Sequence, residues 1–343
     1  MSTIKEIAQK AGVSPTTVAN VIHGKHERVS DETLLRVKKV IQENKYAPNM
    51  GALILAHKHS RIIGVIMFME PRWNETVLED PFSSAILGAM EQEVRNNGYY
   101  VMLHTTSDED EVVRLAKAWK LAGLILVWVP SSICRLIKDT IDTPIVFIDS
   151  YFTDNEHIYH NIGLQDEQGG YEIARYMISM GHIDIVFLAN DSFYAGATDA
   201  IRFKGCQRAF KEVGLPLDSH CYVPLPKERD ERYQMYENLG SPQSPYTALV
   251  FSADYYAAEA VTLLQDSGID VPGEISVTGF DDNIFARLVR PHLTTVHQDS
   301  GEKGRRAIQM VMKLIHNKEV PIANVQLDVA LEIRDSVKRI RET

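Results

Sequence analysis

The sequence predicts a molecule of class α + α/β, in which a small all-helical head precedes a larger α/β body. The charge distribution is the first observation behind this prediction, because residues 1 to 61 carry a net charge of +5 and the remainder carries −15. The second is a change of pattern at Ile62, where apolar residues at helical spacing give way to short β-branched runs alternating with amphipathic segments. The third is length, because 343 residues exceed the ~250 to 300 at which single cores stop growing.

Three short helices are expected in the head. Apolar residues follow helical spacing from Ile4 until Gly12 interrupts them. A second helix should begin after Ser14, whose hydroxyl can cap it, because Pro15 suits the first helical position, where no N–H is needed. A third should begin at Ser30, with acidic residues in its first turn. Its expected apolar face consists of Leu34, Leu35, Val37, Val40 and Ile41.

The second helix is the expected recognition element. If its apolar residues Val18, Val21 and Ile22 face inward, its N-terminal half presents four residues outward: Pro15, Thr16, Thr17 and Asn20. A helix, a tight turn and a second exposed helix form the arrangement that enters the DNA major groove. The alternative is a helical hairpin that only packs on another part of the protein, but it does not explain the local positive charge.

The body should contain two parallel sheets. Short continuous apolar runs separated by amphipathic segments are typical of strands buried on both faces by helices. The first set of expected strands covers 62–67, 99–104, 123–129 and 144–149, with helices over 84–97 and 109–121. The second set covers 183–189, 221–225, 247–252 and 275–280. Two such sheets predict a two-lobed body with a ligand cleft between the lobes.

Acidic residues follow three of these strands. Asp149, Asp254 and Asp281 stand where ligands bind in open α/β sheets, at the carboxyl ends of the strands. Two of them have a specific structural alternative: Asp281 as a helix cap, and Asp254 as the cap of a helix that begins at Tyr255.

Several classes of protein are excluded by the pattern. No run approaches the ~20 apolar residues of a membrane span, and no signal-peptide pattern occurs. Three cysteines without CxxC spacing indicate a reducing compartment, so we expect a cytoplasmic protein. No G-x-G pair, phosphate-binding loop, HExxH or GxSxG motif occurs, which argues against an enzyme and against a cofactor. The acidic run 108–111 is read as a solvated helix start, and no metal site is expected, although His57 and His59 have a possible spacing.

The chain resembles the lactose/galactose repressor (LacI/GalR) family. TIKEIAQKAGVSPTTVANVIHGK and RVSDETLLRVKKVIQENKYAPN are similar to the family's headpiece almost residue for residue. IIGVIM, AGLILV, LQDEQGGYEIARYMISMGHIDIVFLA, VPGEISVTGFDD, RPHLTTVHQD and LEIRDS resemble its core in the same order, so the resemblance covers almost the whole chain.

The resemblance implies an organisation and a function. It implies a helix-turn-helix headpiece over 1–49, a hinge helix and linker over 50–60, and a two-lobed periplasmic-binding-protein-like core. The expected first lobe is 61–162 plus 291–320, and the expected second lobe is 163–290 plus 321–337. The implied function is a ligand-responsive repressor of carbohydrate metabolism that binds a palindromic operator, with a sugar or sugar derivative as effector. Because the chain ends soon after IRDS without a heptad tail, we expect a homodimer.

Family positions also suggest the contact residues. The DNA-binding residues are expected to be Thr3, Lys5, Ser14, Pro15, Thr16, Thr17, Asn20, His23 and Leu55. Leu55 corresponds to the hinge leucine that is wedged into the minor groove, and apolar wedges of this kind bend DNA. The effector-binding residues are expected to be Phe82, Asp149, Arg202 and Asp281, together with Trp73, which is not a family position but lies in a loop that is longer than usual.

Two departures from the family pattern leave alternatives open. Leu53 and Ile54 replace the usual Arg and Ser of the hinge, so the hinge either relies on apolar packing on DNA or packs against the core. The usual Asn-Pro-Phe-Phe is Asp80-Pro81-Phe82-Ser83, which favours keeping a non-sugar metabolite, or a co-repressor, as an alternative effector. Other functions considered are a solute-binding protein and an architectural DNA-binding protein without an effector.

Overall fold

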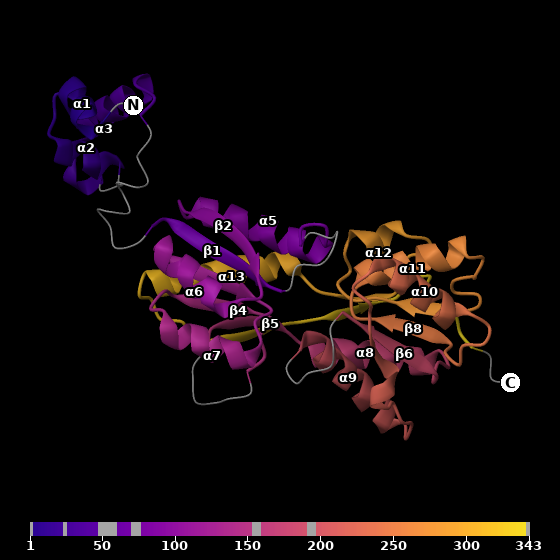
Figure 1. Cartoon of the computed structure of the whole chain (residues 1–343). Coiled ribbons are helices and arrows are strands. Elements are labelled where there is room, and N and C mark those ends of the chain that lie inside the picture. The colour runs from indigo at the N-terminus through magenta and orange to yellow at the C-terminus, as the bar shows by residue number, and fades with distance from the viewer. Residues whose placement is uncertain are drawn as a thin grey trace. The chain divides into compact units, whose positions relative to one another are not determined.

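The computed structural model describes residues 3–22, 26–46, 60–69, 77–152, 159–190 and 197–340. The chain forms two compact units, residues 1–60 and 61–343 (Figure 1). None of the described helices is long and apolar enough to cross a membrane.

The first unit contains the three predicted helices: α1 (Ile4–Ala11), α2 (Pro15–Ile22) and α3 (Asp31–Glu43), with a 3-10 turn η1 (His26–Arg28) before α3. The Ser14 hydroxyl accepts the Thr17 N–H at 3.1 Å, and Ser30 caps α3. A small core is built around Ile7, Val18 and Val37.

The prediction that Leu35 belongs to the apolar face of α3 is wrong. Leu35 is 69% exposed, whereas Val37 is fully buried. Helical residues turn by about 100° each, so Leu35 points away from the side occupied by Val37.

The first lobe of the second unit is built on a six-stranded sheet. Its strand order is β11-β5-β4-β3-β1-β2, and every pairing is parallel. The strands are β1 (Ile62–Phe68), β2 (Tyr100–Thr106), β3 (Gly123–Val127), β4 (Ile145–Ile148), β5 (Asn161–Leu164) and β11 (Asn324–Leu327).

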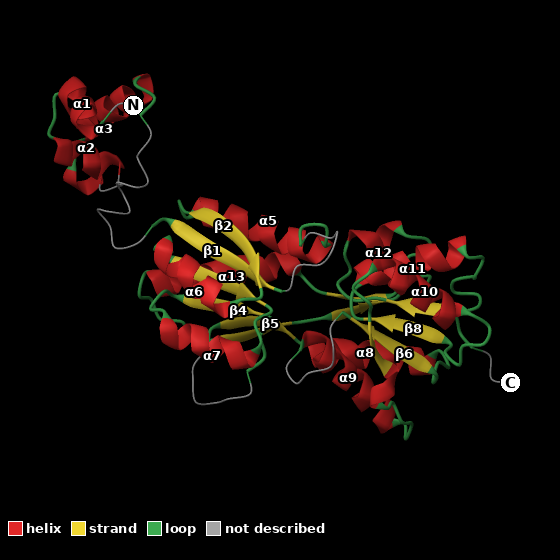
Figure 2. Cartoon of the chain, in the orientation of Figure 1, coloured by secondary structure: helices red, strands yellow, loops and turns green. Residues whose placement is uncertain are grey.

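Helices cover both faces of this sheet, as Figure 2 shows. They are α5 (Pro81–Asn96), α6 (Glu109–Ala118), α7 (Ser131–Thr140) and α13 (Ser300–Ile315). Alternate residues of β1 enter different cores: Val65 packs in the cluster that contains α5 and α13, and Ile66 packs in the cluster that contains α6 and α7. The uninterrupted apolar run of β1 therefore reflects burial on two sides, as predicted.

The second lobe is built on a four-stranded parallel sheet of order β7-β6-β8-β9. Its strands are β6 (Ile185–Ala189), β7 (Tyr222–Pro224), β8 (Ala248–Phe251) and β9 (Ser276–Thr278). Its helices are α8 (Asp166–Ser179), α9 (Thr198–Glu212), η2 (Ser219–Cys221), α10 (Arg229–Gly240), α11 (Asp254–Asp266) and α12 (Ile284–Leu288). A separate antiparallel pair joins β10 (Thr295–His297) to β12 (Ala330–Glu332).

The chain passes between the lobes later than the expected positions near 162, 290 and 320. β5 and β11 pair within the first sheet, so residues 163–164 and 324–327 belong to the first lobe. Thr294 is bridged to Thr278, and His297 of β10 is bridged to Asp281, so residues 294–297 belong to the second lobe. These strands have only three or four residues and carry polar side chains, which leaves little pattern to locate them.

Helix α5 begins at Pro81, three residues before the predicted start. The Asp80 carboxylate caps it by accepting the N–H groups of Phe82 and Ser83, and Pro81 occupies the first position. The departure from the family pattern at Asp80 is therefore a helix start signal. In the acidic run, Asp108 caps α6 in the same way, as expected.

Candidate functional site

The predicted recognition surface lies on α2. Pro15 and Thr16 are exposed, and Thr17 and Asn20 are half-buried. The Ser14 and Thr17 hydroxyls lie 2.9 Å apart, so these two side chains already hold each other at the start of the helix. The Asn20 side chain makes no hydrogen bond to any described residue, which leaves its amide able to donate and accept at a base edge.

The remaining predicted DNA contacts are placed only in part. Thr3 forms a capping box with Glu6, in which the Thr3 N–H donates to the Glu6 carboxylate at 2.9 Å. Lys5 is exposed on the first turn of α1. His23 and Leu55 lie outside the described residues, as does Trp73 among the predicted effector contacts.

The second unit contains a group of buried polar side chains that we call the interlobe cluster: Asp149, Arg202, Asp281, Gln298 and Lys303. Asp149 follows β4 of the first sheet and Asp281 lies just beyond β9 of the second, so both stand at carboxyl ends of strands. Both carboxylates and Arg202 are at most 7% exposed. Lys303 and Gln298 link Asp149 to Asp281 by hydrogen bonds, and the charge of Arg202 acts on both carboxyl groups.

Arg202 is fixed in the second lobe by three contacts. Its Nε donates to Asp166 Oδ1 at 2.7 Å, and its Nη1 donates to the Ser252 carbonyl oxygen at 2.6 Å. The guanidinium also stacks on the Phe280 ring at 3.6 Å from the centroid. Nη2 has no hydrogen-bond partner among the described residues.

The approach of α8 and α9 sets the position of this arginine. A Cβ atom on Gly170 would lie 1.8 Å from the Arg202 carbonyl oxygen, and one on Gly205 would lie 1.9 Å from the Glu167 carbonyl oxygen. The two helix backbones are therefore in direct contact, which only glycine permits. This contact holds Asp166, the first residue of α8, against Arg202.

Asp281 is a carboxylate with few internal partners. It has a positive φ of 118° and accepts a hydrogen bond from the Gln298 amide through Oδ1. No described residue donates a hydrogen bond to Oδ2. Burial raises the pKa of Asp281 well above its usual value; the Arg202 charge opposes this rise, and the Asp254 and Asp80 charges add to it.

Asp149 is held by Lys303, a residue that the sequence interpretation missed. Lys303 Nζ donates to both Asp149 oxygens at 2.8 Å and to Gln298 Oε1 at 2.9 Å. A signal for Lys303 was present, because it stands four and eight residues before the buried Ala307 and Val311 and so lies on the inner face of α13.

Aromatic residues of the first lobe border the cluster. Phe82, the second residue of α5, is 6% exposed, and its ring centroid lies 5.8 Å from that of Trp128. The Lys303 ammonium lies 5.1 Å from the centroid of the Phe82 ring. Trp128 follows β3 directly, so a tryptophan at a strand end was the signal that the sequence interpretation left unused.

The capping role considered for Asp254 is wrong. Helix α11 begins at Asp254 itself, and the Asp254 carboxylate accepts the Asn283 N–H at 2.9 Å and the Thr295 hydroxyl at 2.6 Å. It therefore joins three segments of the second lobe. The capping alternative for Asp281 also fails, since α12 is capped by Asn283.

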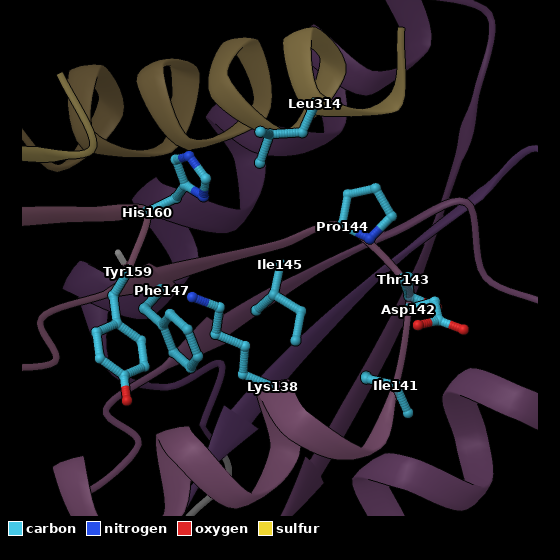
Figure 3. Close-up of a pocket in the computed structure, with 10 residues that line it drawn as sticks. All are labelled: Lys138, Ile141, Asp142, Thr143, Pro144, Ile145, Phe147, Tyr159, His160 and Leu314. Atoms are coloured by element: carbon cyan, nitrogen blue, oxygen red, sulfur yellow. The ribbon is translucent and has the colours of Figure 1, made fainter. Parts of the chain in front are cut away.

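Two surface cavities lie elsewhere. One of about 290 Å³ is bounded by α7, by the start of β4 and by Leu314 of α13, with Lys138 and Tyr159 among its lining residues (Figure 3). Burial and the nearby Lys138 charge lower the pKa of His160 in its wall. The other, of about 420 Å³, lies beside α10. Neither contains a residue of the interlobe cluster. No group of three or more His, Cys, Asp or Glu side chains within the described ranges is arranged to hold a metal ion.

Comparison with known families gives two matches. The family described as bacterial regulatory proteins, lacI family, matches residues 3–49. The periplasmic binding protein-like domain matches residues 174–337.

Full-length relatives agree with these matches. The HTH-type transcriptional repressor PurR of Pasteurella multocida is 30% identical over 98% of this chain and 99% of its own. The HTH-type transcriptional regulator GalR of Escherichia coli is also 30% identical, over 95% of this chain and 93% of its own. Among solved structures, the lac repressor dimer bound to operator and the anti-inducer ONPF is similar with a TM-score of 0.81 and 23% identity, covering 98% of this chain and 99% of that one.

Proposed function

Because the chain belongs to the lacI family of bacterial regulatory proteins, we propose that it binds a palindromic operator as a homodimer and takes a small-molecule effector at the interlobe cluster. At the level of the family it is a DNA-binding transcriptional repressor and not an enzyme.

The proposed effector site is supported by two polar side-chain atoms that have no hydrogen-bond partner in the described part of the chain. Arg202 Nη2 is a donor, and Asp281 Oδ2 can accept when the carboxyl group is ionised and donate when it is protonated; neither atom has a partner among the described residues. A hydroxyl-rich molecule suits both atoms, because a hydroxyl can accept from the guanidinium and can either donate to or accept from the carboxyl group; the bond to the guanidinium is charge-assisted and therefore strong. Phe82 and Trp128 supply an apolar surface for the other side of the ligand. A sugar or sugar derivative fits this chemistry, which supports a role in regulating carbohydrate metabolism.

Operator recognition is assigned to α2 and to the hinge. Asn20 and Thr16 would read base edges, and Ser14 and Thr17 would contact phosphates. Thr3, Lys5, Pro15 and His23 would add backbone contacts on either side, and Leu55 would act as the minor-groove wedge. The family's dimeric arrangement would place two such units on half-sites about one helical turn, or a multiple of it, apart.

The effect of effector binding on operator affinity would be transmitted through the first lobe. The Arg202 and Asp281 contacts lie in the second lobe and Phe82 lies in the first, so a bound molecule joins the lobes. β1 of the first lobe begins at Ile62, directly after the linker. A change in lobe arrangement would therefore alter the spacing of the two hinges, and a coupling of ~1 to 3 kcal/mol changes operator affinity ~5- to 150-fold.

The test is a titration of operator binding with a panel of sugars, sugar acids and other metabolites, on an operator selected from random DNA. Wild type should respond to at least one compound. Arg202→Gln should bind the operator and lose that response, whereas Lys204→Gln, an exposed change on the same helix, should keep it. A response of Arg202→Gln at the wild-type ligand concentration would remove Arg202 from the site.

A further inference from the structure

Lys303 is one of the largest side chains that are fully buried, with 0% exposure. An ammonium group has three N–H donors, and here all three have acceptors. Two bonds go to the Asp149 carboxylate and one to Gln298 Oε1, at 2.8 to 2.9 Å. The Phe82 ring also lies beside the ammonium group, with its centroid 5.1 Å from Lys303 Nζ. The surroundings thus supply a carboxylate, an amide oxygen and an aromatic face, which are the groups that bind primary ammonium ions.

The backbone that carries Lys303 is held firmly in place. A Cβ atom on the next residue, Gly304, would lie 2.7 Å from the Ile86 carbonyl oxygen, so α13 packs closely on α5. Helix α5 carries Phe82 and α13 carries Lys303, which fixes the ring and the ammonium relative to each other. Gln298 extends the arrangement to the second lobe, because its amide donates to Asp281.

We propose that Asp149, Gln298 and Phe82 form an ammonium-binding subsite of the effector site, and that Lys303 determines specificity by filling it. This inference rests on the proposed function, since it treats the interlobe cluster as the effector site. With Lys303 in place, both Asp149 oxygens are engaged and ligands that carry an amine at this end are excluded. Polar recognition is then confined to Arg202 and Asp281, and the first lobe offers the effector the faces of Phe82 and Trp128.

The test removes the tethered ammonium and supplies a free one. Lys303→Ala deletes three carbons and the nitrogen beyond Cβ, which propylammonium replaces atom for atom. Propylammonium chloride is titrated against wild type, Lys303→Ala and Lys303→Ala/Asp149→Asn by calorimetry at constant ionic strength, with 1-propanol as the uncharged probe of equal length. Only Lys303→Ala should bind propylammonium at one saturable site per chain. None of the three proteins should bind 1-propanol as tightly as Lys303→Ala binds propylammonium.

A second readout separates a specificity role from a purely structural ion pair. The same titration is followed by operator binding, where Lys303→Ala should change its operator affinity on the order of 5-fold or more as the subsite fills. Binding of propylammonium without any change in operator affinity would mean that the ion pair is only structural. Equal binding to wild type, binding that survives Asp149→Asn, or no binding would each overturn the proposal.

If Lys303→Ala does not fold alone, refolding from urea is compared with propylammonium and with 1-propanol. Refolding of the variant with propylammonium but not with 1-propanol supports the subsite. Failure to refold with either compound overturns the proposal. The proposed function is tested separately, because its metabolite titration uses wild-type protein without amines. Either experiment can therefore give a negative result while the other supports its proposal.

Discussion

The contact between α8 and α9 yields a prediction with a defined sign. Gly170→Ala places a Cβ atom 1.8 Å from the Arg202 carbonyl oxygen, so the helices must separate by roughly 1.5 Å to reach van der Waals contact. A shift of that size takes the 2.7 Å Arg202–Asp166 bond out of hydrogen-bond range. Overpacking costs ~1 to 3 kcal/mol, and the arginine also loses its position.

Gly88→Ala is the matched control, because it makes the same chemical change inside an α-helix. A Cβ atom on Gly88 of α5 meets nothing within 4 Å, so alanine should stabilise the protein by up to about 1 kcal/mol. Urea unfolding of both variants, together with operator titration in the presence of effector, is the assay. Gly170→Ala should be less stable than wild type and lose effector response, and Gly88→Ala should do neither. Equal stability and intact response in Gly170→Ala would refute the account of how Arg202 is positioned.

Three further predictions concern pH, base reading and the hinge. Burial raises the pKa of Asp254 from 3.8 to about 7, so the folded state keeps a proton that the unfolded chain loses, and the free energy of unfolding falls as pH rises through this window. Asp254→Asn should flatten that part of the profile, as measured by urea unfolding at a series of pH values. Asn20→Ala should relax sequence preference by roughly 1 to 3 kcal/mol at one base pair, whereas Thr17→Ala should weaken all sites alike; uniform loss in both, across a randomised operator library, would contradict the assignment. Leu55→Ala should weaken operator binding and leave the melting temperature unchanged, whereas a core role would lower stability by ~2 to 5 kcal/mol.

The elements that the sequence predicts well are those whose burial is two-sided or whose ends carry a cap. The strands β1, β3 and β4 read as continuous apolar runs, and α2 and α3 begin directly after Ser14 and Ser30, which cap them. Short strands such as β10 and β11 were not predicted, because three or four residues of mixed polarity are too few to show the alternation of apolar and polar side chains.

The candidate site was predicted in part. Asp149 and Asp281 could be found because they end apolar strands, and Arg202 was indicated by resemblance. Lys303 and Gln298 could not be assigned to Asp149 and Asp281, because the bonds join residues up to 154 positions apart. Burial of a lysine depends on a distant carboxylate, and only the folded chain brings the two together.

If effector and operator binding are coupled, each must change the affinity of the protein for the other by the same factor. The affinity of the effector for the protein is measured by calorimetry with and without saturating operator. We expect saturating operator to change effector affinity by the same factor, ~5- to 150-fold, by which effector changes operator affinity. Effector that binds equally well to free and operator-bound protein would contradict this coupling.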